Sequence, residues 1–247
     1  MRWTSGAKAP SVPNGSNVRA KARTLQVDSG TLPIEARTVP NFDRLAKVYR
    51  WMEWLSFGNW LGRCRFAFLG EMLAARRALV LGDGDGRFTA RLLKENRAVR
   101  IDAVDLSAAM LAALMTRAGE DRGRVTPLVA NVRCGVPFGD GYDLVVTHFL
   151  LDCLTTEEVE TLAVSVRARA ADDVVWVVSE FAIPEGWFGR LVAGPVLGFL
   201  YLAFRWMTGL RVQRLPDWVG ALERTGFVRR RRMTWMRGLL VSEVWGR

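Results

Sequence analysis

A glycine-rich turn with two carboxylates is the segment of this sequence whose residue types point most directly to chemistry. Glycines let the backbone turn with positive φ and let a ligand approach without a Cβ in the way. A dinucleotide would press a pyrophosphate against such a turn, and repulsion from two carboxylates there costs on the order of several kcal/mol. The turn therefore disfavours a dinucleotide and suits a cationic ligand such as S-adenosylmethionine, which carries a sulfonium and an ammonium. Its residues are Gly82, Asp83, Gly84, Asp85 and Gly86.

A further carboxylate, Asp105, stands nineteen residues past Gly86 at the end of an apolar run. The two oxygens of a carboxylate match the two hydroxyls of a ribose, so Asp105 is expected to hold an adenosine ribose. Many nucleotide-binding folds share this spacing. It therefore indicates an adenosine ligand without saying which one.

His148 is the only histidine, and it follows an apolar run at residues 142–147. In an open parallel sheet, ligands lie beyond the carboxyl ends of the strands, so His148 is expected near the ligand. In methyl transfer a base is needed only when the acceptor must lose a proton. We take His148 and Asp152 as catalytic candidates and Phe149 as a substrate contact. A purely structural histidine remains the alternative.

The elements that position these residues alternate between apolar strands and helices, which predicts a parallel sheet covered by helices. Two final strands joined by a tight turn near Arg237 and Gly238 must be antiparallel. The predicted fold is α/β, a three-layer Rossmann-like sheet that is mostly parallel and ends in an antiparallel hairpin. Strands are expected at 78–81, 99–104, 124–129, 142–147, 173–181, 227–234 and 239–245, and helices at about 60–76, 87–95, 107–117, 155–169 and 216–225.

The net charge of +10 is concentrated at the two ends of the chain. Residues 1–40 carry six basic and two acidic side chains, and residues 226–247 carry six arginines and one glutamate. No nucleic-acid-binding motif accompanies this charge, which argues against a nucleic-acid partner. Three widely spaced cysteines predict neither disulfides nor a metal site and favour a reducing, cytoplasmic setting.

Composition divides the chain into a flexible basic tail at 1–40, a helical cap at 41–76 and a main domain at 77–247. Tyr49 lies in the cap and is expected to contact substrate. Residues 187–215 are interpreted as a cover, and within it Leu191–Phe204 has no charge. Fourteen residues are too few to span a bilayer, which needs about twenty. The cover predicts a lipophilic acceptor or a membrane-peripheral position, with a core helix as the alternative.

Residues 42–247 resemble the class I S-adenosylmethionine-dependent methyltransferases, most closely the ubiquinone/menaquinone C-methyltransferases. The resemblance rests on the glycine turn, on Val104-Asp105-Leu106-Ser107 with Met110 following, on the strand that begins at Tyr142, and on residues 222–227 before the hairpin. It implies S-adenosylmethionine as cofactor, with the glycines at its methionine and ribose. It also implies Asp105 at the ribose, with Leu106 and Met110 beside the adenine.

Two positions depart from that family. Val80 stands where the family usually has an acidic residue, so Asp83 or Asp85 is expected to take over the contact with the ammonium group. Asn131 and Val132 follow the third strand, where the family usually has aspartate near the adenine. The predicted function is methyl transfer to a small, lipophilic acceptor at carbon or oxygen. A nicotinamide-dependent oxidoreductase and an inactive S-adenosylmethionine-binding protein are the alternatives, and the oligomeric state stays open.

Overall fold

A computed structural model describes residues 59–136, 139–184, 186–187, 189–195, 198 and 215–247, all within the unit Thr38–Arg247. The predicted tail, Tyr49 and most of the cover lie outside the described residues. Seven strands form one sheet in the order β3-β2-β1-β4-β5-β7-β6. They are β1 (Arg77–Leu81), β2 (Arg100–Asp105), β3 (Val125–Val129), β4 (Tyr142–His148), β5 (Ala170–Phe181), β6 (Val228–Trp235) and β7 (Leu240–Gly246).

The first five strands are parallel. After each of the first four, a crossover returns the chain to the end of the sheet at which the strands begin. β7 runs antiparallel between β5 and β6, with Ser179 opposite Ser242 and Trp235 opposite Leu240. The predicted mostly parallel sheet with an antiparallel C-terminal pair is therefore confirmed.

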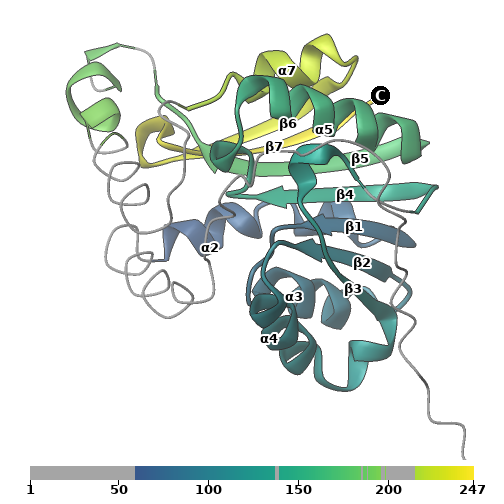
Figure 1. Cartoon of the computed structure of the whole chain (residues 1–247). Helices are drawn as coiled ribbons and strands as arrows, with labels where there is room; N and C mark the ends of the chain where they lie inside the picture. The colour runs from purple at the N-terminus through teal and green to yellow at the C-terminus, as the bar shows by residue number, and fades with distance from the viewer. Residues whose placement is uncertain (1–58, 137–138, 185, 188, 196–197, 199–214) are drawn as a thin grey trace, which may run out of the picture. The chain divides into compact units, whose positions relative to one another are not determined.

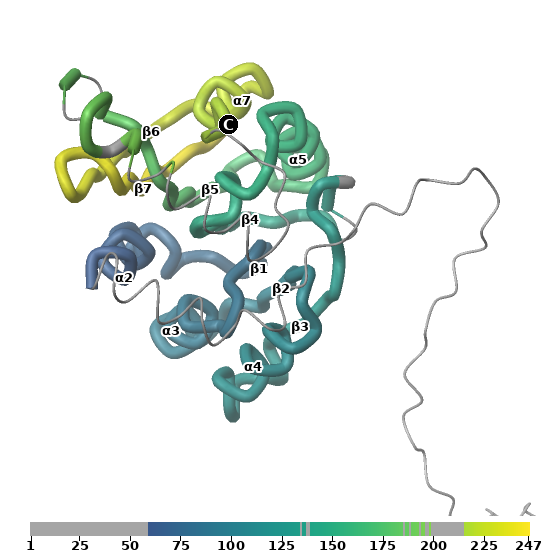
Figure 2. The backbone as a smooth tube through the Cα atoms, turned by 60° about the vertical axis from the view of Figure 1, so that its left-hand side comes forward, coloured from purple at the N-terminus to yellow at the C-terminus, as the bar shows by residue number. Residues whose placement is uncertain are grey.

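Helices cover both faces of the sheet (Figure 1). α3 (Arg87–Glu95) and α4 (Ala108–Ala118) pack on one face, and α5 (Thr156–Arg169) and α7 (Trp218–Arg224) on the other, as the turned view also shows (Figure 2). Strand residues supply both cores alternately, because neighbouring side chains of a strand point to opposite faces. In β1, for example, Leu79 faces α5 while Val80 faces α3.

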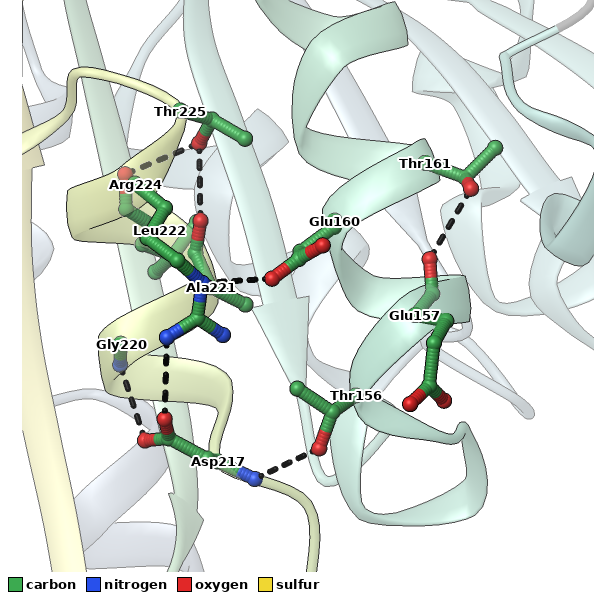
Figure 3. A network of polar contacts seen from close by, with 10 residues as sticks. All are labelled: Thr156, Glu157, Glu160, Thr161, Asp217, Gly220, Ala221, Leu222, Arg224 and Thr225. Carbon is green, nitrogen blue, oxygen red and sulfur yellow. Dashed lines mark hydrogen bonds and ion pairs between the residues drawn. The ribbon is translucent and has the colours of Figure 1, made fainter.

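Polar contacts join α5 to α7 on the solvent side of their shared core (Figure 3). The Arg224 guanidinium lies 2.6 Å from a carboxylate oxygen of Glu160 and 3.3 Å from one of Asp217. The Asp217 amide donates to Thr156 Oγ1 at 3.1 Å, and Asp217 also caps α7 by accepting from the Gly220 amide. These contacts fix the helix that leads into β6.

Two element boundaries differ by three or more residues from those that the sequence predicts. The helix expected at about 60–76 is α2 (Trp60–Arg65), which is followed by a 3-10 turn at Leu69–Met72. Gly70 weakens a continuous helix there, and the tighter turn buries Phe68 and Met72 in the core under α3. β5 begins at Ala170 rather than Asp173, because α5 ends directly where β5 starts to pair with Tyr142.

Candidate active site at the carboxyl edge of the sheet

The turn after β1 depends on glycine backbone geometry. Gly82, Gly84 and Gly86 have φ angles of +71°, +59° and +80°, a region that side chains with a Cβ rarely adopt. At Gly86 a Cβ would lie 2.7 Å from the backbone Cα of Leu114, so this glycine lets α3 and α4 approach each other. At Gly84 the nearest described atom is Met110 Sδ, 3.9 Å from such a Cβ. Gly84 therefore faces the open space that a ligand needs.

Both aspartates of the turn bind groups of this chain. Asp83 accepts from the backbone amides of Phe88 at 3.3 Å and Thr89 at 2.8 Å, so it caps the N-terminus of α3. Burial raises the pKa of Asp83, while these donors and the nearby Arg65 charge act in the opposite direction. Asp85 forms ion pairs with Arg117 at 2.9 Å and Arg87 at 3.4 Å. Because both carboxylates already have partners within the chain, they attract a cationic ligand less strongly than the sequence alone suggests.

The cap gives a stability prediction that is separate from ligand binding. Asp83→Ala leaves two amide donors of α3 without their acceptor, and the free energy of unfolding is expected to fall by about 1–2 kcal/mol. Urea denaturation measures this change. Asp83→Asn keeps a capping oxygen and should lose less than half as much. Equal losses for both variants would show that the cap is not the cause.

Asp105 connects the end of β2 to the glycine turn. Its carboxylate accepts from the Gly84 amide at 3.2 Å and from the Ser107 amide at 2.9 Å. Ser107 caps α4 by accepting from the Met110 amide. The structure thus brings together three residues predicted to bind cofactor, Gly84, Asp105 and Met110. The Asp105 carboxylate, beside the open space at Gly84, can accept hydrogen bonds from the two hydroxyls of a ribose. These groups therefore suit a nucleoside cofactor.

The other predicted cofactor residues flank this centre. Leu106 is half-buried directly after Asp105. Asn131 is exposed beyond β3, and its side-chain oxygen accepts from the Arg133 amide. The Val132 and Val80 side chains are buried in opposite cores of the sheet. Val80 thus replaces the family's acidic group with a packing contact.

His148 is the last residue of β4 and is almost fully buried. Its ring packs edge-on to Phe88 at 4.6 Å between centroids, and neither ring nitrogen has a hydrogen-bond partner among the described residues. Burial, and secondarily the Arg65 charge, hold the pKa of His148 well below its usual value, so the ring is neutral at neutral pH. Phe149 follows with φ of +55°, and its ring lies 5.2 Å from that of Phe181.

Two buried carboxyl groups lie beside the segment that follows β4, and only one of them, Asp152, is predicted from the sequence. The other, Glu180, is fully buried near the end of β5, and its Oε1 accepts from the Leu150 amide at 2.9 Å and the Leu151 amide at 2.7 Å. Burial raises the pKa of Asp152 to about 6. Burial and the Asp152 charge raise the pKa of Glu180 well above its usual value. In each carboxyl one oxygen has no partner among the described residues.

Arg65, at the end of α2, is a second site residue that the sequence analysis missed. Its charge acts on Asp83, His148 and Cys64, and its guanidinium carbon lies 5.7 Å from the centroid of the Phe149 ring. The helical cap therefore contributes a cation to the carboxyl edge. Among the described residues, no group of three or more histidine, cysteine or acidic side chains could hold a metal ion.

Residues 78–171 match the methyltransferase domain family. The match covers β1 through the start of β5, including the glycine turn, Asp105, His148 and Asp152. Residues 78–171 are therefore similar to a methyltransferase domain, and the sheet around them has the class I methyltransferase fold. The finer resemblance to the ubiquinone C-methyltransferases stays a prediction.

Solved structures share the fold of the methyltransferase domain. The mitomycin 7-O-methyltransferase MmcR is 15% identical, with a TM-score of 0.63 over 83% of this chain and 60% of that one. A putative O-methyltransferase from Nostoc punctiforme is 18% identical, with a TM-score of 0.65 over 84% and 61%. CalO1, a methyltransferase in calicheamicin biosynthesis solved with S-adenosylhomocysteine, is 20% identical, with a TM-score of 0.60 over 83% and 59%. This chain thus spans about 60% of the length of these proteins, and no curated protein sequence matches it significantly.

Proposed function

We propose that this chain transfers the methyl group of S-adenosylmethionine to a small, lipophilic acceptor at oxygen or carbon. One observation carries the proposal. The Gly84–Asp105 contact and the buried His148–Asp152 segment follow neighbouring parallel strands, so a nucleoside site and titratable groups share one edge of the sheet. The structural relatives named for mitomycin and calicheamicin support a small-molecule acceptor.

The chain's own residues would hold the cofactor through backbone and carboxylate groups. Gly84 offers open space, Asp105 offers acceptor oxygens for a ribose diol, and Met110 and Leu106 offer apolar contact. Arg65 supplies a cation suited to the carboxylate of the methionine portion. When bound, S-adenosylmethionine supplies a methyl group already attached to a good leaving group. Holding the acceptor in line and excluding water then accounts for most of the rate, up to about 7–11 kcal/mol of the barrier.

Asp152 is the better candidate for the proton acceptor. A general base works best when its pKa is near the working pH, and the pKa of Asp152 is about 6. His148, whose pKa is held well below its usual value, would take up a proton poorly. Its two ring nitrogens, which have no partner within the described part of the chain, suit a hydrogen bond to the acceptor or the cofactor instead. If the acceptor is a hydroxyl, its proton would pass to the Asp152 carboxylate as the oxygen is methylated.

The apolar surroundings of this edge favour a lipophilic acceptor. The rings of Phe149 and Phe181 pack with Leu239 and Leu240 directly beyond His148 and Glu180. An aromatic and aliphatic wall with a few polar groups is typical of pockets for small organic ligands. We therefore expect Phe149 to contact the acceptor.

Isothermal calorimetry with S-adenosylmethionine, S-adenosylhomocysteine and NADH tests the cofactor assignment. Gly84→Ala adds a methyl group where the ligand approaches the backbone, so cofactor affinity should fall by about tenfold or more, while positive-φ strain lowers stability by only about 1–2 kcal/mol. Gly123→Ala is the control, because nothing lies within 4 Å of its Cβ position. Binding of NADH without S-adenosylmethionine would overturn the proposal. Tight cofactor binding without turnover on a broad panel of phenols, hydroxyquinones and lipid quinones would favour an inactive binding protein.

A further inference from the structure

A turn surface with exposed apolar side chains and arginines lies at the same edge of the sheet as the proposed active site. We define it as Ile183, Trp187, Leu191 and Val192 with Arg190 and Arg237. Trp187 is 63% and Leu191 72% exposed, although large apolar side chains are usually at least half covered in folded domains. The surface follows β5 and includes residues of the π-helix Gly189–Ala193, in the helical segment drawn in green at the left of Figure 1.

Contacts with the β6–β7 hairpin fix the position of this surface. The Ala182 amide donates to the Leu239 carbonyl at 2.9 Å, and a Cβ at Gly238 would lie 3.2 Å from the Pro184 side chain. The Arg237 guanidinium carbon is 5.7 Å from the centroid of the Trp187 ring. These contacts attach the beginning of the turn surface, from Ala182 to Trp187, to the hairpin.

The helix α2 holds a second pair of a tryptophan ring and an arginine. Trp60 is partly exposed, and the Arg63 guanidinium carbon lies 4.9 Å from the centroid of its ring. Leu61 on α2 packs in the same apolar cluster as Phe181 and Leu239, so α2 and the hairpin share this edge of the sheet. Tryptophan beside arginine suits the interface between lipid headgroups and acyl chains, where the ring lies among apolar groups and the guanidinium reaches phosphate.

We propose that the turn surface docks the chain on an anionic lipid bilayer. The charges complement such a bilayer, because the described residues that form the surface include two arginines and no acidic residue. In the sequence, residues 182–212 contain three arginines and one glutamate, a net +2. Among the described residues, no helix is long and apolar enough to cross a membrane. Docking on a bilayer surface would also bring the edge with His148 and Asp152 close to lipophilic molecules dissolved in the bilayer.

Vesicle sedimentation of the full chain tests this docking, with phosphatidylcholine vesicles and with vesicles of phosphatidylcholine and phosphatidylglycerol. Wild type should sediment with the anionic vesicles and less with the neutral ones. Trp187→Ser with Leu191→Ser should lower the partition coefficient about tenfold or more, and Arg237→Gln about fivefold. The control is Val164→Ser with Val228→Ser, whose side chains are 58% and 60% exposed on α5 and β6.

Three results would overturn the proposal. One is no binding to either vesicle, and another is equal losses in the test and control pairs, which would show that binding does not depend on this surface. The third is a concentration-dependent dimer that the Trp187 and Leu191 substitutions dissociate without a change in vesicle binding, since a second copy would then be the occupant. The docking does not depend on the proposed methyl transfer. Calorimetry with S-adenosylmethionine on the same variants should show unchanged affinity, so the two proposals fail separately.

Discussion

Gly86→Ala is expected to lower the free energy of unfolding by about 3–5 kcal/mol, which would make much of the purified protein unfold at mild urea concentrations. Two effects add. The φ of +80° strains any residue with a Cβ, and the new methyl would overlap the backbone and side chain of Leu114 on α4. Backbone cannot move aside as a flexible side chain can, so α3 and α4 would have to separate.

A matched glycine separates strain from overlap. Gly119 has a φ of +57°, and no atom lies within 4 Å of its Cβ position, so Gly119→Ala should show the strain alone, about 1–2 kcal/mol. Urea denaturation followed by circular dichroism measures both variants. If Gly86→Ala loses no more than Gly119→Ala, then the contact with Leu114 is not a tight constraint.

Asp152 is expected to make the protein less stable as the pH rises from about 4 to about 6. Burial raises the folded-state pKa of Asp152 from 3.8 to about 6. Below pH 4 the carboxyl is protonated in both states and has no effect. Between the two values the unfolded chain loses its proton while the folded protein keeps it, so the folded state binds more protons and stability falls with pH. A pKa difference of about two between the folded and unfolded states corresponds to roughly 3 kcal/mol of unfolding free energy. This contribution is fully lost above the folded-state pKa.

Asp152→Asn isolates this effect, because the amide cannot ionise. The decrease in unfolding free energy between pH 4 and pH 7 should be smaller by about 2–3 kcal/mol in the variant than in the wild type. The comparison uses the change with pH, since an amide in place of a carboxyl also alters hydrogen bonding at every pH. Asp173→Asn, at an exposed position within β5, is the control. An identical pH dependence for Asp152→Asn and wild type would contradict the buried, proton-retaining carboxyl.

The same carboxyl connects stability with the proposed chemistry. A pKa near 6 leaves Asp152 mostly ionised at neutral pH and still able to accept a proton. The burial that produces this pKa also destabilises the ionised protein. A loss of stability at the residue best suited to act as a base is typical of functional sites.

The sequence was sufficient for the parts of the fold that depend on periodicity and on tight turns. The strand–helix alternation and the antiparallel hairpin both depend on neighbours in the chain. The end of α2 at Arg65 could not be predicted. It depends on the burial of Phe68 and Met72 against α3, a tertiary contact that overrides local helical periodicity.

The site was only partly predictable for a related reason. Gly84 and Asp105, which the sequence assigns to one cofactor site, contact each other because adjacent parallel strands end at one edge. The partners of Asp83 and Asp85 were not foreseen, since the ion pair between Asp85 and Arg117 joins residues 32 positions apart. The sequence did contain a signal for the role of Glu180. An acidic residue at the end of a continuous apolar strand must find donors, and here the Leu150 and Leu151 amides provide them.

The position of β7 inside the sheet has a consequence for biosynthesis. β5 and β6 do not pair with each other, and the strand that joins them is the last of the three to be translated. While the ribosome makes the roughly sixty residues between the end of β5 and the start of β7, the apolar edge around Val177 stays open. Such an edge invites pairing with another nascent chain. Yield in a heterologous host should therefore depend on chaperone capacity and growth temperature more than on the stability of the finished fold.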